Sequence, residues 1–217
     1  MIKIDIKNNG FHLFKENIFE INDVIIDEFK EIYQKNLNVR AKEKVATIND
    51  LDGLKKFENI KKVFNQIIKI LEFNNFNDIK FDDVWFVNSN KDIYKKDKLP
   101  YVPHIDKARK LKVMIYLNEV KLENGPIHFV KINPNKYENF RKKLGENYKE
   151  KQENEIKDIQ IAKYEPLTGK FGTTIFFDTN TPHFAGKIEN VSAERKVIRF
   201  NFSLNKKKII FKNFFSI

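Results

Sequence analysis

Two stretches in the first 99 residues carry apolar side chains at helical spacing. Between Val24 and Ile32 they recur every three or four positions, which predicts a helix from residue 22 or 23 to about residue 36. The same period over residues 52–72 predicts a longer helix. No proline precedes Pro100, so no proline interrupts a helix in this region. Both helices are expected to pack their apolar faces on the outside of a sheet.

Later stretches have the shorter period or the dense apolar character of strands. Four strands are predicted, over residues 79–88, 112–119, 172–178 and 195–203. Trp85, the single tryptophan, is expected in the core, and a place in a pocket wall is the alternative. The basic and apolar tail, residues 206–217, has no helical stripe. It predicts a closing strand or edge segment, with contact to a membrane surface as the alternative.

A chain of 217 residues predicts a single domain with a sizeable core. Residues 1–99 would form a helical support region with the first strands, and residues 100–217 the remaining strands. Residues 134–157 interrupt those strands with a charged, helix-compatible insert. We expect this insert to be a solvated helical excursion, or a lid that governs substrate choice without contributing to stability.

The net charge of +11 suggests an acidic partner, but the kind of basic residue argues against one. Only five of the 41 basic residues are arginine, and Asn, Ile and Phe are abundant, as A/T-rich codons would give. Nucleic-acid recognition would favour the guanidinium fork. The chain has no cysteine, and no apolar run approaches the roughly 20 residues of a membrane span. Without a signal-peptide pattern at its start, the protein is predicted to be cytoplasmic.

The chemistry is concentrated in three residues near predicted strand ends. His104 and Asp106 are two positions apart, so on an extended segment both side chains point to one side. His183 follows another predicted strand and only a folded sheet can bring it near. Two imidazoles and one carboxylate can occupy one face of an octahedral metal and leave the other positions open, as in non-haem Fe(II) oxygenases.

Several segments resemble one family in their order and spacing. They are Pro-His-Ile-Asp (103–106), Ile-Tyr-Leu-Asn-Glu-Val (115–120), Glu-Asn-Gly-Pro-Ile-His-Phe-Val (123–130), Phe-Asp-Thr-Asn-Thr-Pro-His (177–183) and Asn-Val-Ser-Ala-Glu-Arg (190–195). Together they resemble the phytanoyl-CoA dioxygenase-like branch of the Fe(II)/2-oxoglutarate-dependent oxygenases. The resemblance implies a mainly β fold with a double-stranded β-helix, or jelly-roll, core and N-terminal support helices.

The resemblance also implies the cofactors and their ligands. Fe(II) would bind His104, Asp106 and His183, with 2-oxoglutarate and O2 at the remaining positions. Arg195 would hold the far carboxylate of 2-oxoglutarate, and Met114 would lie beside it inside the barrel. The family often has a hydroxyl residue two positions after the distal histidine, where this chain has Ala185. Thr174 or Ser192 is therefore expected to supply the second contact to that carboxylate.

The expected activity is hydroxylation of a small-molecule or carrier-bound substrate. The intact Asp106 favours hydroxylation, because related halogenases replace this carboxylate to admit halide. A protein or peptide hydroxylase remains an alternative. A nucleic-acid demethylase is disfavoured by the spacing of the arginines. Arg195 and Arg199 are four positions apart, whereas the paired arginines of those enzymes are six positions apart. A silent jelly-roll binding protein, without catalytic activity, is the remaining alternative.

His128 is either a substrate-side donor or, as we expect, a solvated strand histidine. Oligomeric state is not determined by the sequence.

Overall fold

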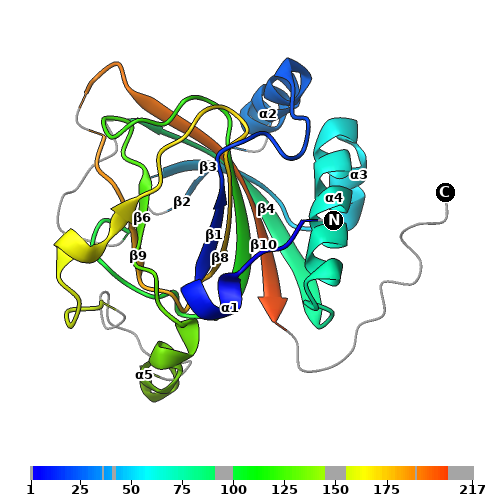
Figure 1. Cartoon of the computed structure of the whole chain (residues 1–217). Coiled ribbons are helices and arrows are strands. Elements are labelled where there is room, and N and C mark those ends of the chain that lie inside the picture. The colour runs from blue at the N-terminus through cyan, green and yellow to red at the C-terminus, as the bar shows by residue number, and fades with distance from the viewer. Residues whose placement is uncertain are drawn as a thin grey trace.

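The computed structural model describes residues 2–35, 37–40, 43–90, 100–144, 155–188 and 190–204. Two sheets lie face to face, and helices cover the outer face of the larger sheet (Figure 1). This is the predicted jelly-roll core with N-terminal support helices.

The elements follow one another in this order. They are α1 (Ile6–Asn9), β1 (Phe11–Phe14), α2 (Asp23–Lys35), β2 (Leu37–Arg40), β3 (Glu43–Ile48), α3 (Leu51–Lys55), α4 (Glu58–Phe73), β4 (Ile79–Asn90), β5 (Lys110–Tyr116), β6 (Ile127–Phe129), η2 (Pro134–Tyr137), α5 (Glu138–Leu144), η3 (Ile161–Lys163), β7 (Glu165–Pro166), β8 (Thr174–Asp178), β9 (His183–Ala185) and β10 (Glu194–Leu204).

The larger sheet has the strand order β1-β8-β5-β10-β4-β3-β2, and all its pairs are antiparallel. The smaller sheet has the order β7-β6-β9. A bridge between His104 and His183 adds the segment before β5 to its edge. Both candidate histidines therefore belong to the smaller sheet, which faces the centre of the larger one.

Strict alternation along β5 and β10 divides their side chains between two cores. On one face, Val113 and Phe200 pack with the helices. On the other face, Met114 and Val197 pack between the two sheets. Polar residues share this second, interior face, because the side-chain period of a strand is two. Arg199 is one of them, two positions along β10 from Val197.

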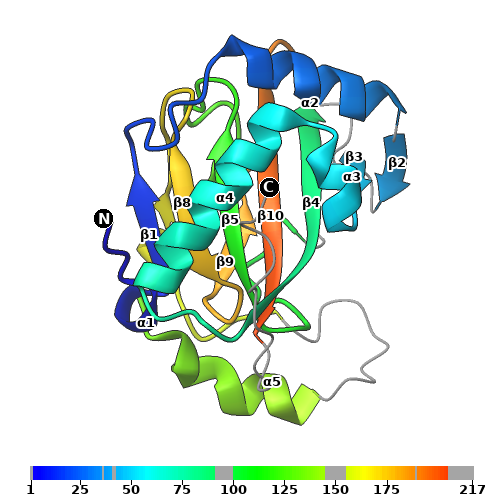
Figure 2. The same cartoon turned by 90° about the vertical axis from the view of Figure 1, so that its right-hand side faces the viewer.

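Helices α2 and α4 cover the outer face of the larger sheet, with α4 lying across its central strands (Figure 2). The single helix predicted over residues 52–72 is wrong in one respect, because the chain breaks at Phe57 into α3 and α4. Phe57 offers α4 no side-chain cap. Instead, the carboxylate of Glu28 in α2 accepts the backbone N–H groups of Asn59 and Ile60, both at 3.0 Å. A residue of another helix thus accepts hydrogen bonds from two backbone N–H groups in the first turn of α4.

The four predicted strands are present as β4, β5, β8 and β10, although the second ends at Tyr116 and not at residue 119. The short strands β1, β2, β3, β7 and β9 were not predicted, whereas β6 contains the expected strand histidine, His128. The tail at residues 206–217 lies outside the described residues. No helix in the described parts of the chain has both the length and the apolarity needed to cross a membrane.

The insert at residues 134–157 is not the independent excursion expected from its charge. Tyr137 and Ile156, near its two ends, are buried against Ile105, which lies between two of the candidate ligands. The backbone N–H of Ile156 donates to the carbonyl of Pro103 at 2.8 Å. Residues 145–154 are outside the described part. The ends of the insert thus support the segment carrying His104, and the dispensability of the whole insert for stability stays a prediction.

Candidate metal centre

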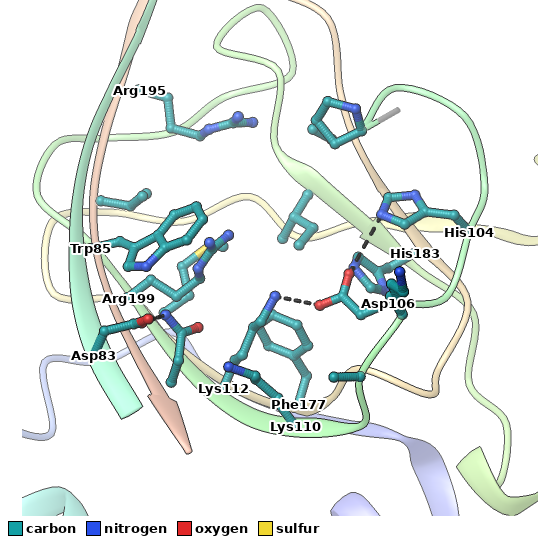
Figure 3. Close-up of a pocket in the computed structure, with 18 residues that line it drawn as sticks. Asp83, Trp85, His104, Asp106, Lys110, Lys112, Phe177, His183, Arg195 and Arg199 are labelled. Atoms are coloured by element: carbon teal, nitrogen blue, oxygen red, sulfur yellow. Dashed lines mark hydrogen bonds and ion pairs between the residues drawn. The ribbon is translucent and has the colours of Figure 1, made fainter. Parts of the chain in front are cut away.

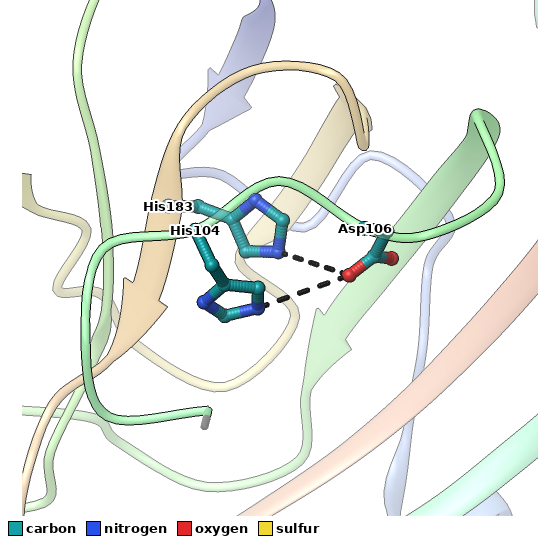
Figure 4. Close-up of side chains that lie close together, drawn as sticks. All are labelled: His104, Asp106 and His183. Carbon is teal, nitrogen blue, oxygen red and sulfur yellow. Dashed lines mark ion pairs between the residues drawn. The ribbon is translucent and has the colours of Figure 1, made fainter. Parts of the chain in front are cut away.

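The structure brings His104, Asp106 and His183 together (Figure 4). One ligand atom from each lies within 4.8 Å of the others. The Oδ1 atom of Asp106 is 3.8 Å from Nε2 of His104 and 3.7 Å from Nε2 of His183. Three donors of the N,N,O type thus converge on one point from one side, which is the donor set that suits Fe(II) in an open site.

Backbone pairing fixes the relative positions of the three residues. His104 and His183 exchange hydrogen bonds between their N–H and carbonyl groups at 3.0 and 2.9 Å. The N–H of Asp106 donates to the carbonyl of Thr179 at 3.0 Å. The ring of His183 stacks on Phe129, with centroids 5.3 Å apart. The site is therefore held by the sheet itself, which limits how far the ligands can separate.

Both imidazoles are held with one nitrogen turned away from the cluster. Nδ1 of His104 lies 2.8 Å from the carbonyl oxygen of Val102, and Nδ1 of His183 lies 2.8 Å from that of Thr181. A carbonyl oxygen can only accept a hydrogen bond, so each Nδ1 carries the proton and each Nε2 has a free lone pair. Burial lowers the pKa of His183 to about 3 and also lowers that of His104. Both rings are thus neutral at pH 7, as metal ligation requires.

The second oxygen of Asp106 has a different partner. Its Oδ2 accepts a hydrogen bond from the Nζ of Lys112 on β5, while Oδ1 faces the histidines. Burial raises the pKa of Asp106, but the positive charge of Lys112 and its hydrogen bond outweigh this effect, and the net shift of the pKa is downward. The carboxylate is therefore ionised, with one oxygen engaged by the lysine. This arrangement favours one-oxygen coordination and leaves more of the metal's positions open.

We expect Lys112→Met to lower the free energy of unfolding of the metal-free protein by about 1–3 kcal/mol, because a partly buried carboxylate oxygen loses its partner. A bound divalent metal would offset the unpaired charge. The difference from wild type should therefore shrink at saturating Ni(II), and Lys112→Arg should retain most of the stability. Urea unfolding with and without Ni(II) measures both effects. An equal loss in the two conditions would mean that Lys112 acts by packing alone.

The cluster forms part of the wall of a cavity of about 470 Å³ between the sheets (Figure 3). Arg195 at the start of β10 also lines it. Its side chain is buried, and its Nη1 has no hydrogen-bond partner among the described residues. An unpaired buried guanidinium nitrogen is costly, so the site has a place for an anionic ligand. A carboxylate matches the guanidinium geometry.

The other predicted site residues have different outcomes. Met114 lines the cavity, as expected, and Ala185 does too. Thr174 lies on the opposite face of β8 from Phe177, and its hydroxyl donates to the carbonyl of Gly172 at 3.0 Å. Ser192 is exposed, and its hydroxyl donates to Asn190. The structure therefore does not bring Thr174 or Ser192 to the cavity. Neither residue is placed to make the expected contact to the carboxylate of a co-substrate.

His128 is half-buried on β6, and its ring stacks on Phe184 with centroids 4.4 Å apart. It is neither the fully solvated histidine expected nor one of the residues lining the cavity. Trp85 both packs against the interior core and lines the cavity, so the two interpretations of it are compatible.

Sequence reasoning missed the roles of Lys112, Asn201 and Asp83, which all line the cavity. The alternation of β5 placed Lys112 on the same face as Met114, which was a usable signal. Its contact with Asp106 was not predictable, since it depends on how the loop between residue 106 and β5 folds back.

A jelly-roll fold with a two-histidine, one-carboxylate cluster in its cavity defines a class of metal-site proteins. The sequence adds a family similarity over part of the chain. Residues 96–197 match the model of the family described as phytanoyl-CoA dioxygenase (PhyH). This part of the chain is therefore similar to the phytanoyl-CoA dioxygenase family. No curated protein sequence gives a significant match.

Solved structures with the same fold are distant in sequence. The epimerase SnoN from nogalamycin biosynthesis, described as non-haem and α-ketoglutarate dependent, has a TM-score of 0.62 at 12% identity, over 91% of this chain and 80% of its own. EvdO2 from Micromonospora carbonacea var. aurantiaca, complexed with 2-oxoglutarate, has a TM-score of 0.56 at 13% identity, over 91% and 88%. HygX from Streptomyces hygroscopicus, with nickel and 2-oxoglutarate bound, has a TM-score of 0.55 at 11% identity, over 91% of this chain and 84% of its own.

Proposed function

We propose that this protein is a non-haem, Fe(II)- and 2-oxoglutarate-dependent dioxygenase that hydroxylates a small-molecule or carrier-bound substrate in the cytoplasm. The chain would act as one domain. The observation that carries the proposal is the combination, in one cavity, of the His104, Asp106 and His183 cluster with the buried, unpaired nitrogen of Arg195.

Each residue of the site has a defined task in this proposal. The Nε2 atoms of His104 and His183 and the Oδ1 of Asp106 would hold the metal, and Lys112 would keep the other carboxylate oxygen engaged. Arg195 would bind the far carboxylate of 2-oxoglutarate in a partly dry pocket, where a charge-assisted pair is strong. Met114 would pack beside that co-substrate. With O2, the bound Fe(II) and 2-oxoglutarate supply the oxidising power, and succinate and CO2 are formed.

The reaction outcome is proposed from Asp106, whose carboxylate occupies the position that a halide would need. SnoN is described as an epimerase and SnoK, another protein with this fold, as a carbocyclase, so the fold alone does not select hydroxylation. A silent binding protein is disfavoured, because the metal cluster is complete and an arginine in the same cavity has a buried nitrogen left for a ligand. A protein or peptide side chain remains an alternative substrate for the same chemistry.

Anaerobic addition of Fe(II) and 2-oxoglutarate is expected to give a weak visible charge-transfer band and to stabilise the fold. At about 100 times the dissociation constant, a ligand that binds only the folded state adds about 2.7 kcal/mol. Glutarate has both carboxylates but lacks the keto oxygen needed for chelation, so it should give no band. Absorption spectroscopy and thermal unfolding provide the two readouts. If Fe(II) and 2-oxoglutarate give neither a band nor stabilisation, the proposed function is wrong.

A further inference from the structure

The cavity has two ends of different chemistry. Near Arg195, its wall is mainly apolar, with Val197 and Ile127 among the lining residues. At the other end, three adjacent strands of the larger sheet present polar side chains. Lys112 on β5 pairs in register with Asn201 on β10, and Asn201 pairs with Asp83 on β4. All three line the cavity, which gives a continuous polar row across the sheet.

The next row along the same strands adds a guanidinium. Arg199 pairs in register with Met114 on one side and with Trp85 on the other. Its guanidinium carbon lies 4.3 Å from the centroid of the Trp85 ring, within cation–π range. The indole thereby restricts the orientation of the guanidinium in the wall of the cavity (Figure 3). A guanidinium held in this way offers a fork of donors matched to an oxyanion.

Asn201 shows that the polar row has an unmet acceptor. The residue is 2% exposed, and its Nδ2 donates to the Oδ1 of Asp83. Its own Oδ1 is buried and has no hydrogen-bond partner among the described residues. Buried amide oxygens normally have a partner, so this atom points to a ligand that carries a donor.

The charges of the described lining residues agree with an anionic ligand. Arg195, Arg199 and three lysines line the cavity, against two carboxylates, Asp83 and Asp106. Lys110 also pairs with Asp82 at 2.9 Å, just outside the lining. A divalent metal together with a 2-oxoglutarate dianion would leave this balance unchanged. The described lining residues thus keep a net positive charge when both are bound.

We propose that this end of the cavity recognises the substrate, and that the substrate is a polar small molecule with an oxyanion, either a carboxylate or a phosphate ester, next to a hydroxyl group. The proposal rests on the function proposed above and specifies its substrate class. Arg199 binds the oxyanion, and the Oδ1 of Asn201 accepts from the hydroxyl. A purely apolar chain is excluded from this end, because it would leave the buried polar row unsatisfied.

Matched small probes test this assignment without knowledge of the natural substrate. Glycerol 3-phosphate and glycerate carry a hydroxyl beside a phosphate ester or a carboxylate, and glycerol is the neutral control. Their binding is measured by calorimetry on protein loaded with Ni(II) and 2-oxoglutarate. At least one anionic probe is expected to bind at least about tenfold more tightly than glycerol, a difference of about 1.4 kcal/mol. The tighter of the two identifies the oxyanion.

Variants then locate the binding site. Arg199→Gln should weaken the anionic probe by at least about tenfold, and Arg199→Lys should weaken it less. Lys131→Gln removes an exposed lysine that does not line the cavity and should leave probe binding unchanged. Asn201→Ala should weaken glycerol 3-phosphate more than it weakens inorganic phosphate, which lacks the neighbouring carbinol. This last comparison separates a contact to the hydroxyl from a general loss of packing.

Three results would overturn the assignment. Glycerol could bind as tightly as both anionic probes, or Arg199→Gln could bind the anionic probes as tightly as wild type does. The third is that Arg195→Gln, and not Arg199→Gln, loses binding of the anionic probes. Should wild-type protein fail to bind 2-oxoglutarate, the proposed function fails separately. The probes are therefore also titrated without 2-oxoglutarate, where loss on Arg199→Gln still supports the polar recognition site.

Discussion

His183→Ala is expected to reduce the affinity for Fe(II) by roughly 100-fold or more. Four-ligand zinc sites bind with about 10–16 kcal/mol, hence roughly 3 kcal/mol per ligand, and each 1.4 kcal/mol is a factor of ten. The Nε2 of His183 is one of three converging ligand atoms, and no other histidine among the described residues belongs to the cluster. The loss of metal should also abolish the charge-transfer band and the consumption of 2-oxoglutarate.

His128→Ala is the matched control for this experiment. His128 lies on the neighbouring strand of the smaller sheet, and its Nδ1 is also close to the carbonyl oxygen two residues before it, at 3.0 Å. It is not part of the ligand cluster. Competition with a chromophoric chelator under anaerobic conditions measures the affinity. Equal Fe(II) affinity in His183→Ala and wild type would refute the metal assignment.

Arg195→Gln is expected to raise the 2-oxoglutarate requirement at least about tenfold while leaving Fe(II) binding nearly intact. Hydrogen bonds to charged groups contribute about 1.5–3 kcal/mol, and 1.4 kcal/mol already corresponds to tenfold. The Nη1 of this guanidinium is buried and has no hydrogen-bond partner among the described residues, so a carboxylate could bind there. The metal ligands lie on other elements, so their positions do not depend on this side chain.

Arg199→Gln is the comparison that decides between the two arginines. They are two alternations apart on β10, roughly 13 Å along the strand, so only one can meet a carboxylate of a co-substrate held at the metal. Titration of 2-oxoglutarate against the rate of its consumption gives the requirement for each variant. If Arg199→Gln raises it and Arg195→Gln does not, the two roles are reversed, and the polar end of the cavity holds the co-substrate instead.

Strong local patterns allowed much of this protein to be predicted from its sequence. The helical spacing between Val24 and Ile32 gave α2 within a residue of its observed ends. The two-residue period placed Arg195 and Arg199 on one face of β10, and both line the cavity. The same period placed His104 and Asp106 on one side of an extended segment. Such inferences succeed because they depend only on backbone geometry within one element.

Other features were decided by contacts between distant segments. The break between α3 and α4 depends on Glu28, a residue of another helix, so no local pattern marks it. The ends of the insert are buried against Ile105, although the insert between them is highly charged. Short strands such as β7 and β9 have too few residues for a recognisable period, and they exist because each pairs with β6.

The site shows the same division between sequence and tertiary structure. The sequence by itself determined which residue types were available as ligands, and that His104 and Asp106 would act as a pair. Only the folded sheet determined that His183 joins them, through reciprocal backbone hydrogen bonds with His104. It also determined that Lys112 reaches Asp106, and that Thr174 faces away from the cavity. The periodicity of a strand fixes which residues share a face, whereas the packing of the sheets fixes which face surrounds the cavity.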